Sequence, residues 1–314
     1  MPKSSGIVLK KCLGLKKDEK LLVVTDSKLY SIGKMFFEDA KKITRYAKLI
    51  KISIPKVHGT EPSKKVAEEM LKYDAGLLIT TKSLSHTKAR KNACDNGARI
   101  ITMPGVTRDM IKQTLNIDYD RLKKINNRIA NIMDKRSIAR IKTELGTDIS
   151  FSIRGRNAWG RDSGLYVNKG AFGNLPAGEV FIAPVEKSAN GIFIVDASFA
   201  GFGKLLSPIK VYVKNGHAIK FSGKKSKKLE NLLDSVGKEA RNIAEFGIGT
   251  NNKAKVTGNI LEDEKVIGTC HIALGNNAGF GGKVNVQLHL DGIIKKPTIW
   301  LDNKKIMDNG KFLI

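Results

Sequence analysis

The sequence predicts a mixed α/β fold: an N-terminal domain on a parallel sheet, and a mainly β C-terminal domain with a buried helix. Three observations support this. Short apolar runs alternate with amphipathic segments up to about residue 135, glycines and short apolar runs dominate from about residue 148, and one strong helical pattern interrupts them. A chain of 314 residues suits two domains, which we expect at residues 1–140 and 141–314.

The first domain has the β-α-β-α order that favours a parallel sheet. Strands are expected at Leu21–Thr25, Leu49–Ile54, Gly76–Thr80 and Arg99–Met103. Helices are expected near residues 32–46, 63–73 and 86–96, and then near 107–115 and 119–140. The chain contains neither a phosphate-binding Gly-x4-Gly-Lys-Ser/Thr motif nor a strand-borne dinucleotide fingerprint.

The second domain is expected to be mainly antiparallel. Its first strands are predicted at Ile149–Ile153, Val180–Ile182, Gly191–Val195 and Ile209–Val213. Apolar residues then recur at helical spacing, which predicts one helix that reaches Glu245 and stops at Gly247 and Gly249; they are Leu229, Leu232, Leu233, Val236, Ala240 and Ile243. Two further strands are expected around residues 265–274 and 283–294.

The formal net charge of +26 invites a nucleic-acid function. Residues 1–140 contain 31 basic and 14 acidic residues, but the basic ones are scattered along expected helix surfaces. Aromatic residues make up 6% of the chain and are not interleaved with the basic ones, so no platform for base stacking is visible. We interpret the charge as mainly solvated surface with weak affinity for polyanions, and a specific nucleic-acid role remains the alternative.

Composition also predicts the compartment. No stretch approaches the roughly 18 apolar residues that a membrane span needs, so no membrane association is expected. The N-terminus lacks the apolar core of a secretory signal. The three cysteines, Cys12, Cys94 and Cys270, are an odd number without metal-finger spacing, which indicates a reducing, cytoplasmic location.

The strand expected from Val284 to Asp291 carries the strongest indication of a metal site. Its side chains alternate, so one face would hold Asn285, Gln287, His289 and Asp291. A histidine and an aspartate two residues apart can converge on one cation. The alternative is an edge strand with an ordinary polar outer face.

Three further residues extend this set. His271 lies in a mostly apolar strand, where the alternative is a hydrogen-bonded core histidine. Glu245 would end the long helix, where a carboxylate opposes the helix dipole, and the alternative is an exposed residue. Glu179 precedes an apolar strand, where the alternative is a surface strand end. Five nitrogen and oxygen donors with carboxylates predominating suit a hydrolytic metal pair.

Four segments carry a family resemblance, in family order: Gly173–Pro184, Ala244–Gly249, Glu262–Ala273 and His289–Asp291. They resemble the motifs of the aminopeptidase T (leucyl aminopeptidase) family of metallopeptidases. The segments Ser83–Arg90 and Gly97–Gly105 look like that family's N-terminal domain.

The resemblance implies a two-metal, usually dimeric aminopeptidase that acts on peptides. Its metal ligands would be Glu179, Glu245, His271, His289 and Asp291, carried over from the family motifs. Two divalent ions (zinc, cobalt or manganese) would activate a water molecule, and Glu179 or Glu245 would orient it and transfer its proton. The chain departs from the family in being shorter and in placing Ala278 where the family has a tyrosine.

That departure supports an alternative chemistry on the same scaffold. His271, His289 and Asp291 form a 2-His-1-carboxylate set, which suits non-haem Fe(II) and dioxygen. Some dioxygenases that open dihydroxypyridine rings resemble the same peptidase family. A further alternative is a non-enzymatic, basic nucleic-acid-binding protein.

His86 is a candidate substrate contact. It follows a predicted parallel strand at its carboxyl end, where open α/β sheets usually bind ligands. The alternative is that Ser85 or Thr87 caps the next helix and His86 has no role in binding.

Overall fold

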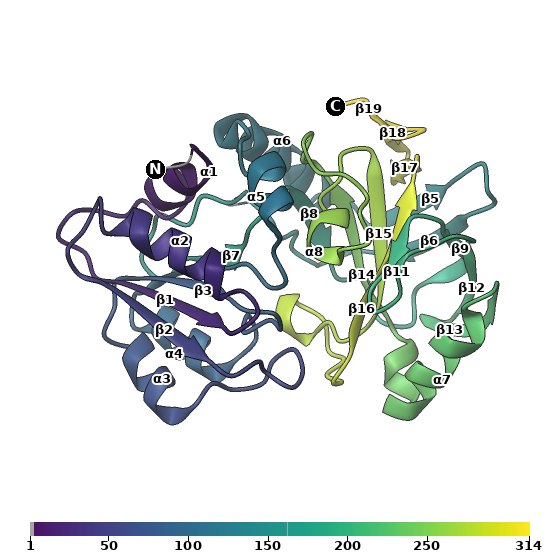
Figure 1. Cartoon of the computed structure of the whole chain (residues 1–314). Coiled ribbons are helices and arrows are strands. Elements are labelled where there is room, and N and C mark those ends of the chain that lie inside the picture. Colours follow the sequence, from purple (N-terminus) through teal and green to yellow (C-terminus); the bar gives the residue numbers. More distant parts are fainter. Residues whose placement is uncertain (1–2, 162) are drawn as a thin grey trace. The chain divides into compact units, whose positions relative to one another are not determined.

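The computed structural model describes residues 3–161 and 163–314, which form two compact units (Figure 1). Unit 1 comprises the described residues up to Tyr119 together with Gly164–Ala177. Unit 2 comprises Asp120–Ser163 and Gly178–Ile314. The predicted combination of a parallel-sheet α/β part and a β-rich C-terminal part is confirmed.

Unit 1 is built on a five-stranded sheet in the order β2-β1-β3-β4-β7, in which every pairing is parallel. The strands are β1 (Leu21–Asp26), β2 (Ala47–Ile52), β3 (Ala75–Ile79), β4 (Arg99–Thr102) and β7 (Phe172–Asn174). The helices are α1 (Lys3–Gly6), a π-helix (Ile7–Cys12), α2 (Tyr30–Ala40), α3 (Lys64–Met70), α4 (Lys88–Asp95) and α5 (Arg108–Thr114). All residues of β1, β3 and β4 are buried, as expected of parallel strands covered on both faces.

Unit 2 contains two antiparallel sheets. The six-stranded sheet has the order β11-β10-β16-β15-β14-β8, and the eight-stranded sheet has the order β13-β12-β9-β6-β5-β17-β18-β19. The six-stranded sheet comprises β8 (Glu179–Ile182), β10 (Ser198–Phe199), β11 (Gly203–Lys204), β14 (Ile243–Gly249), β15 (Thr269–Gly275) and β16 (His289–Lys295). The other comprises β5 (Ile138–Lys142), β6 (Asp148–Ser152), β9 (Asn190–Val195), β12 (Ile209–Lys214), β13 (His217–Ser222), β17 (Thr298–Leu301), β18 (Lys304–Asp308) and β19 (Lys311–Phe312).

One hydrophobic core joins the two sheets of unit 2. It contains Phe151 and Phe193 from the eight-stranded sheet and Phe246 and Ile272 from the six-stranded sheet. The rings of Phe151 and Phe246 meet edge to face at 5.4 Å. The helices of this unit are α6 (Tyr119–Met133, which begins at the last residue of unit 1), α7 (Ser226–Val236) and α8 (Ile260–Asp263), with short 3-10 turns at Lys238–Arg241 and Ala278–Phe280.

The prediction of one helix as far as Glu245 is wrong. Helix α7 ends at Val236, because the next residue, Gly237, has a φ of 118°, which residues other than glycine rarely adopt. A 3-10 turn follows, and the chain then enters β14, every residue of which is buried. Ala240 and Ile243 are buried as the periodicity requires, but on these other elements. Glu245 is therefore a strand residue, and the helix-dipole argument does not apply to it.

The strand predicted from residue 283 begins later, at His289. The preceding segment is irregular, although its exposure alternates as expected: Val284, Val286 and Leu288 are half-buried, while Asn285 and Gln287 are exposed. Its backbone carbonyls accept hydrogen bonds from two asparagines that follow β15: Asn277 N donates to Val284 O, and Asn276 N donates to Leu288 O.

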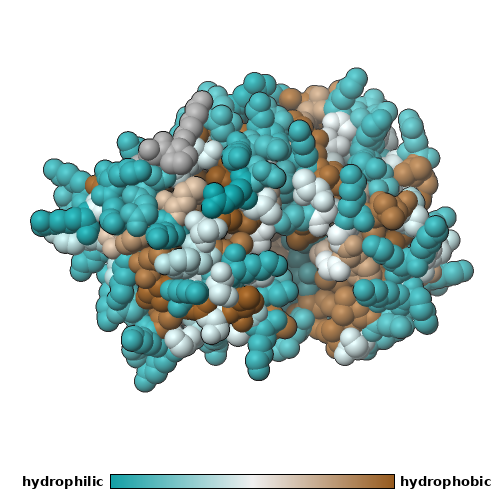
Figure 2. Space-filling view, viewed as in Figure 1, coloured by the Kyte–Doolittle hydropathy of each residue, from teal (hydrophilic) through white to brown (hydrophobic). Residues whose placement is uncertain are grey.

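Polar side chains cover most of the face shown in Figure 2, with hydrophobic areas between them. None of the helices in the described part of the chain combines the length and the apolar character needed to cross a bilayer.

Candidate metal centre

Four neighbouring strands of the six-stranded sheet bring the predicted donors together (Figure 1). Glu179 begins β8, Glu245 lies in β14, His271 lies in β15, and β16 contributes His289 and Asp291. All five predicted metal-site residues therefore belong to unit 2.

The strand register places these side chains on one face of the sheet. Glu245 is paired with Ala273, and Ala273 with Asp291. His271 lies two residues before Ala273, and His289 lies two residues before Asp291, so both project to the same side as this row. Each histidine has a glycine opposite it on one neighbouring strand: Gly247 opposite His271 and Gly275 opposite His289. Small residues between the donors leave room for the imidazoles.

The donor atoms are close enough to share a cation. His271 Nε2 lies 3.1 Å from Glu245 Oε1 and 3.6 Å from Glu179 Oε2. His289 Nε2 lies 3.4 Å from Glu245 Oε2 and 3.3 Å from Asp291 Oδ1. The five residues thus form two overlapping triads that share Glu245, one with Glu179 and His271 and the other with His289 and Asp291.

A backbone carbonyl orients His289. Its Nδ1 lies 2.8 Å from Asn276 O, and a carbonyl oxygen can only accept a hydrogen bond. Nδ1 therefore carries a proton in both the neutral and the charged ring, and Nε2 is the nitrogen that faces the carboxylates. Metal-ligating histidines are commonly fixed in this way.

Charge holds the metal-free donors as imidazolium–carboxylate pairs. Burial lowers the pKa of His271, but the hydrogen bond to Glu245 and the nearby carboxylates outweigh it and raise this pKa to about 9. The pKa of His289 is likewise raised despite burial, chiefly by the charge of Asp291. In turn, burial raises the pKa of Asp291, but the His289 charge outweighs burial and lowers this pKa to about 2. A cation would replace these protons.

Buried atoms without partners indicate that the donor set fits a metal ion. Glu179 Oε2, Asp291 Oδ1 and His271 Nδ1 are buried and form no hydrogen bond within the described structure. Buried polar atoms are normally satisfied, because leaving one unpaired costs roughly 1–3 kcal/mol. Each of the two oxygens belongs to one of the triads, so a cation bound there would give it a partner.

Two residues of this region had no assigned role in the sequence interpretation. Lys265 is 1% exposed, and its Nζ lies 2.6 Å from Glu179 Oε1 and also contacts Glu264 Oε1. Burial lowers the pKa of Lys265, but the two carboxylates outweigh it and raise this pKa above its usual value, so the ammonium stays charged. In the sequence, the one indication of such a role was the charged run Glu262-Asp263-Glu264-Lys265, which lies directly before an apolar strand.

The loop between β15 and β16 covers the His289 side of the site. Phe280 lies edge-on to His289, with ring centroids 5.9 Å apart, and edge-on to Phe181 at 5.5 Å. Glu186 anchors the loop, accepting from Lys283 N at 2.7 Å and Asn277 Nδ2 at 3.2 Å. Ala278, at the position of the family tyrosine, is exposed.

His86 lies in unit 1, exposed, just before α4. Thr87 is the N-cap of this helix: its side chain accepts from Arg90 N at 3.2 Å and donates to Leu84 O. The capping interpretation of this segment is therefore confirmed, and a role of His86 in substrate binding stays a prediction.

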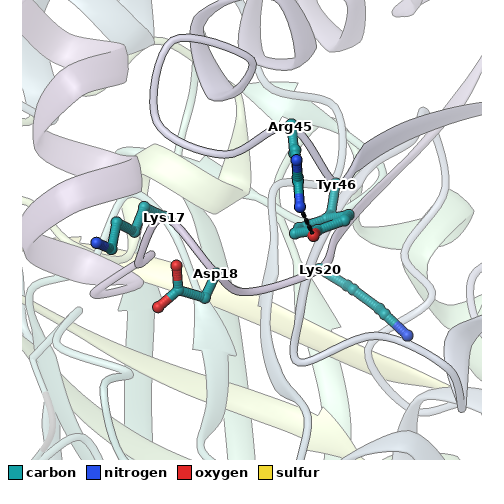
Figure 3. A pocket seen from close by; sticks show the side chains of 5 residues that line it. All are labelled: Lys17, Asp18, Lys20, Arg45 and Tyr46. Carbon is teal, nitrogen blue, oxygen red and sulfur yellow. Dashed lines mark hydrogen bonds between the residues drawn. The ribbon is translucent and has the colours of Figure 1, made fainter.

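Unit 1 also has an open surface hollow of about 570 Å³, lined by Lys17, Asp18, Lys20, Arg45 and Tyr46 (Figure 3). The Arg45 guanidinium lies over the Tyr46 ring, 4.8 Å from its centroid, and hydrogen-bonds the phenol oxygen. The side chains of Lys17 and Lys20 point away from each other in Figure 3. The hollow brings basic and aromatic groups together, but its basic side chains do not converge on one point. Nucleic-acid binding therefore stays a prediction.

The fold and the donor cluster define an α/β protein with a carboxylate–histidine cluster, a candidate metal centre, on its C-terminal antiparallel sheet. The family profile described as NicX, 2,5-dihydroxypyridine 5,6-dioxygenase, matches residues 8–314, and the chain belongs to this family. Comparison with curated proteins gave no match.

Two solved structures share the fold. The 2,5-dihydroxypyridine dioxygenase of Pseudomonas putida KT2440 is 18% identical with a TM-score of 0.82, over 99% of this chain and 96% of that one. AmpT from Thermus thermophilus is 16% identical with a TM-score of 0.74, over 99% and 98%. At these identities the likeness shows the fold alone.

The family assignment corrects the aminopeptidase interpretation. The chain belongs to a dioxygenase family, so its identification as a metallo-aminopeptidase, a hydrolase and protease acting on peptides, is wrong. The error has a physical reason: AmpT has the same fold, and a cluster of carboxylates and imidazoles can serve either chemistry. Ala278 was the residue that pointed to the alternative.

Proposed function

We propose that the protein is an iron-dependent dioxygenase that opens the ring of a hydroxylated pyridine, with 2,5-dihydroxypyridine as the first substrate to test. The observation that carries the proposal is the family match over residues 8–314. The convergence of two imidazoles and several carboxylates on one sheet face supports it.

His271, His289 and Asp291 would hold the iron as a 2-His-1-carboxylate set, and Glu179 Oε2, 3.6 Å from His271 Nε2, would be a further donor on the His271 side. Bound Fe(II) would supply the one-electron chemistry that allows dioxygen to react with an electron-rich ring. Glu245 contacts both imidazoles, at 3.1 Å and 3.4 Å, so it would fix their mutual orientation.

The protein's own groups suit an aromatic substrate. Phe280 and Phe181 form an aromatic cluster beside His289. Such rings pack against another ring edge to face or in offset stacks. The carbonyl of Asn276 holds the imidazole of His289 in place while substrate enters and leaves.

Oxygen uptake by iron-loaded protein tests the proposal. The protein is loaded with Fe(II) without air, mixed with 2,5-dihydroxypyridine and then exposed to ¹⁸O₂. We expect one dioxygen to be consumed per ring opened, with both labelled atoms in the product. His289→Ala should abolish the uptake, whereas Gln287→Ala, on the exposed segment before β16, should not.

Two controls complete this test. A panel of aminoacyl amides, offered to protein loaded with zinc, cobalt or manganese, should remain intact. Amide hydrolysis without oxygen uptake, or iron-loaded protein that leaves a panel of hydroxylated pyridines unchanged, would overturn the proposal.

A further inference from the structure

Lys265 is a buried cation beside the metal centre. It follows α8 and precedes β15, and 1% of its surface is exposed. A lysine is almost never fully buried unless it is paired, because its ammonium loses its hydration. Its position therefore depends on the groups around Nζ.

Two carboxylates receive this ammonium. Lys265 Nζ donates to Glu179 Oε1 at 2.6 Å and to Glu264 Oε1. Both acids are largely buried: the side chain of Glu179 is 16% exposed and that of Glu264 is 14% exposed. Glu264 is the residue directly before Lys265, and burial raises the pKa of its carboxyl group to about 8.

The other oxygen of Glu179 is left for the metal centre. Glu179 Oε2 is buried, has no hydrogen-bond partner in the described structure, and lies 3.6 Å from His271 Nε2. The lysine thus holds one oxygen of this carboxylate while the other faces the donor cluster.

The backbone fixes the lysine on the sheet. Asn251 N donates to Lys265 O at 2.8 Å. The end of β14 is packed so closely against this segment that a Cβ on Gly249 would overlap Val266 O. Lys265 therefore approaches Glu179 from a closely packed segment of backbone.

We propose that Lys265 is a positioning residue that binds Glu179 Oε1 and presents Glu179 Oε2 to a divalent cation at the His271 side of the centre. This inference rests on the proposed function for the identity of the cation but not for its presence. Partners that orient metal ligands typically change metal affinity about 10- to 100-fold when they are lost.

Cation affinity in Lys265→Met tests the role. Methionine keeps a long, unbranched side chain and removes the ammonium group. We expect affinity for Co(II), used as an air-stable spectroscopic probe and measured by titration of its visible absorption, to fall about 10- to 100-fold. Lys225→Met is the matched control, because Lys225 is half-buried in the same unit and donates to a backbone carbonyl, Phe202 O. Its affinity should equal that of the unmodified protein.

Loss of folding is separated from loss of positioning by a second variant. Lys265→Met leaves two largely buried carboxyl groups without the ammonium. Combining it with Glu264→Gln makes one of these groups permanently neutral and should recover thermal stability. We expect cobalt affinity to stay low in this double variant, because Glu179 is still not held. Recovery of both stability and affinity would show that Lys265 is structural and overturn the proposal.

A double-mutant cycle identifies the route of the effect. If Lys265 acts through Glu179, adding Lys265→Met to Glu179→Gln should lower cobalt affinity no further than Glu179→Gln alone. Additive losses would overturn the proposal. Failure of the proposed function is distinguishable, because protein that binds cobalt normally but opens no pyridine ring contradicts the dioxygenase activity and leaves this inference intact.

Discussion

Gly247 lies directly across the β14–β15 ladder from His271, and a Cβ at Gly247 would overlap the imidazole at Nε2. The absence of a side chain on one strand therefore makes space for the imidazole on the next. No positive φ is involved at this position, so the requirement is for space alone.

Gly247→Ala should displace His271 and empty the centre. We expect metal content to fall sharply and the free energy of unfolding to drop by about 1–3 kcal/mol, the usual cost of overpacking. Metal analysis and thermal melting check both. Gly76→Ala is the matched control: this strand glycine is in β3, and the nearest atom to an added Cβ is 3.4 Å away. Full metal content in Gly247→Ala would show that the imidazole can move without loss.

The sequence was sufficient for most of the architecture. The four parallel strands expected in unit 1 are apolar runs between amphipathic helices, and the structure places each within a few residues of its expected position, whereas the fifth, β7, was not predicted. The error at Glu245 shows the limit of periodicity. Buried residues continued at helical spacing past Gly237, but the φ of that glycine and the pairing of β14 with β15 and β8 decided the conformation.

The sequence predicted which five side chains would lie together, but it did not predict the partners around them. A histidine and an aspartate two apart on β16 share a face whatever the rest of the fold, so the spacing of His289 and Asp291 was informative. The partnership of Lys265 with Glu179 joins residues 86 positions apart and depends on tertiary packing. No local pattern encodes such a contact.

His289→Ala and Asp291→Ala should each lose the bound iron while the protein stays folded. Their side chains project from the donor face of β16, whereas Ile293 and Ile294 of the same strand are fully or almost fully buried. Loss of a group that orients a metal ligand typically lowers metal affinity roughly 10- to 100-fold. We expect loss of a ligand itself to lower iron affinity by at least this much. Anaerobic Fe(II) titration and circular dichroism measure the two effects. Normal iron content in both variants would remove β16 from the centre.

Acid should weaken unit 1 through the pair of Glu19 and Arg99. Both carboxylate oxygens of Glu19 accept from this buried guanidinium, at 2.9 Å and 2.6 Å. Burial raises the pKa of Glu19, but the hydrogen bonds from Arg99 and Lys16 N outweigh it and hold this pKa below its usual value of 4.5. The pair therefore contributes stability that is present above pH 4.5 and is lost as pH falls through the lowered pKa.

Glu19→Gln tests this pH dependence. At neutral pH the substitution should cost about 1–3 kcal/mol of unfolding free energy, since it leaves a buried guanidinium without its charge partner. The difference from the unmodified protein should shrink below pH 4.5, as measured by denaturant titration across pH. Glu38→Gln removes an exposed pair with Lys41 and should cost less than about 1 kcal/mol. A pH-independent loss in Glu19→Gln would contradict the assignment.

The basic charge should act diffusely. Unit 1 contains 25 basic and 12 acidic residues and unit 2 contains 31 and 18, so each has a net charge of +13. Lys17→Glu, Lys20→Glu and Arg45→Glu together reverse three charges that form no ion pair with described residues. A second variant replaces Lys214, Lys224 and Lys304 by glutamate instead. We expect both variants to leave a nucleic-acid column at a lower salt concentration than the unmodified protein, and by the same amount. A fall confined to the first variant would locate a specific site at the hollow.

Phe280 should affect the substrate more than the metal. Its ring lies edge-on to His289 and to Phe181, on a loop anchored by Glu186, and it is half-buried. An aromatic pair contributes about 0.5–1.5 kcal/mol beyond burial, which corresponds to roughly 2- to 12-fold in affinity. Phe280→Leu should therefore raise the KM for a hydroxylated pyridine by about that factor and leave iron content unchanged. Phe202→Leu removes a similar edge-on ring, paired with Phe199 at 5.8 Å, and should leave KM unaltered. If iron content falls with KM unchanged, Phe280 supports His289 and does not contact the ring.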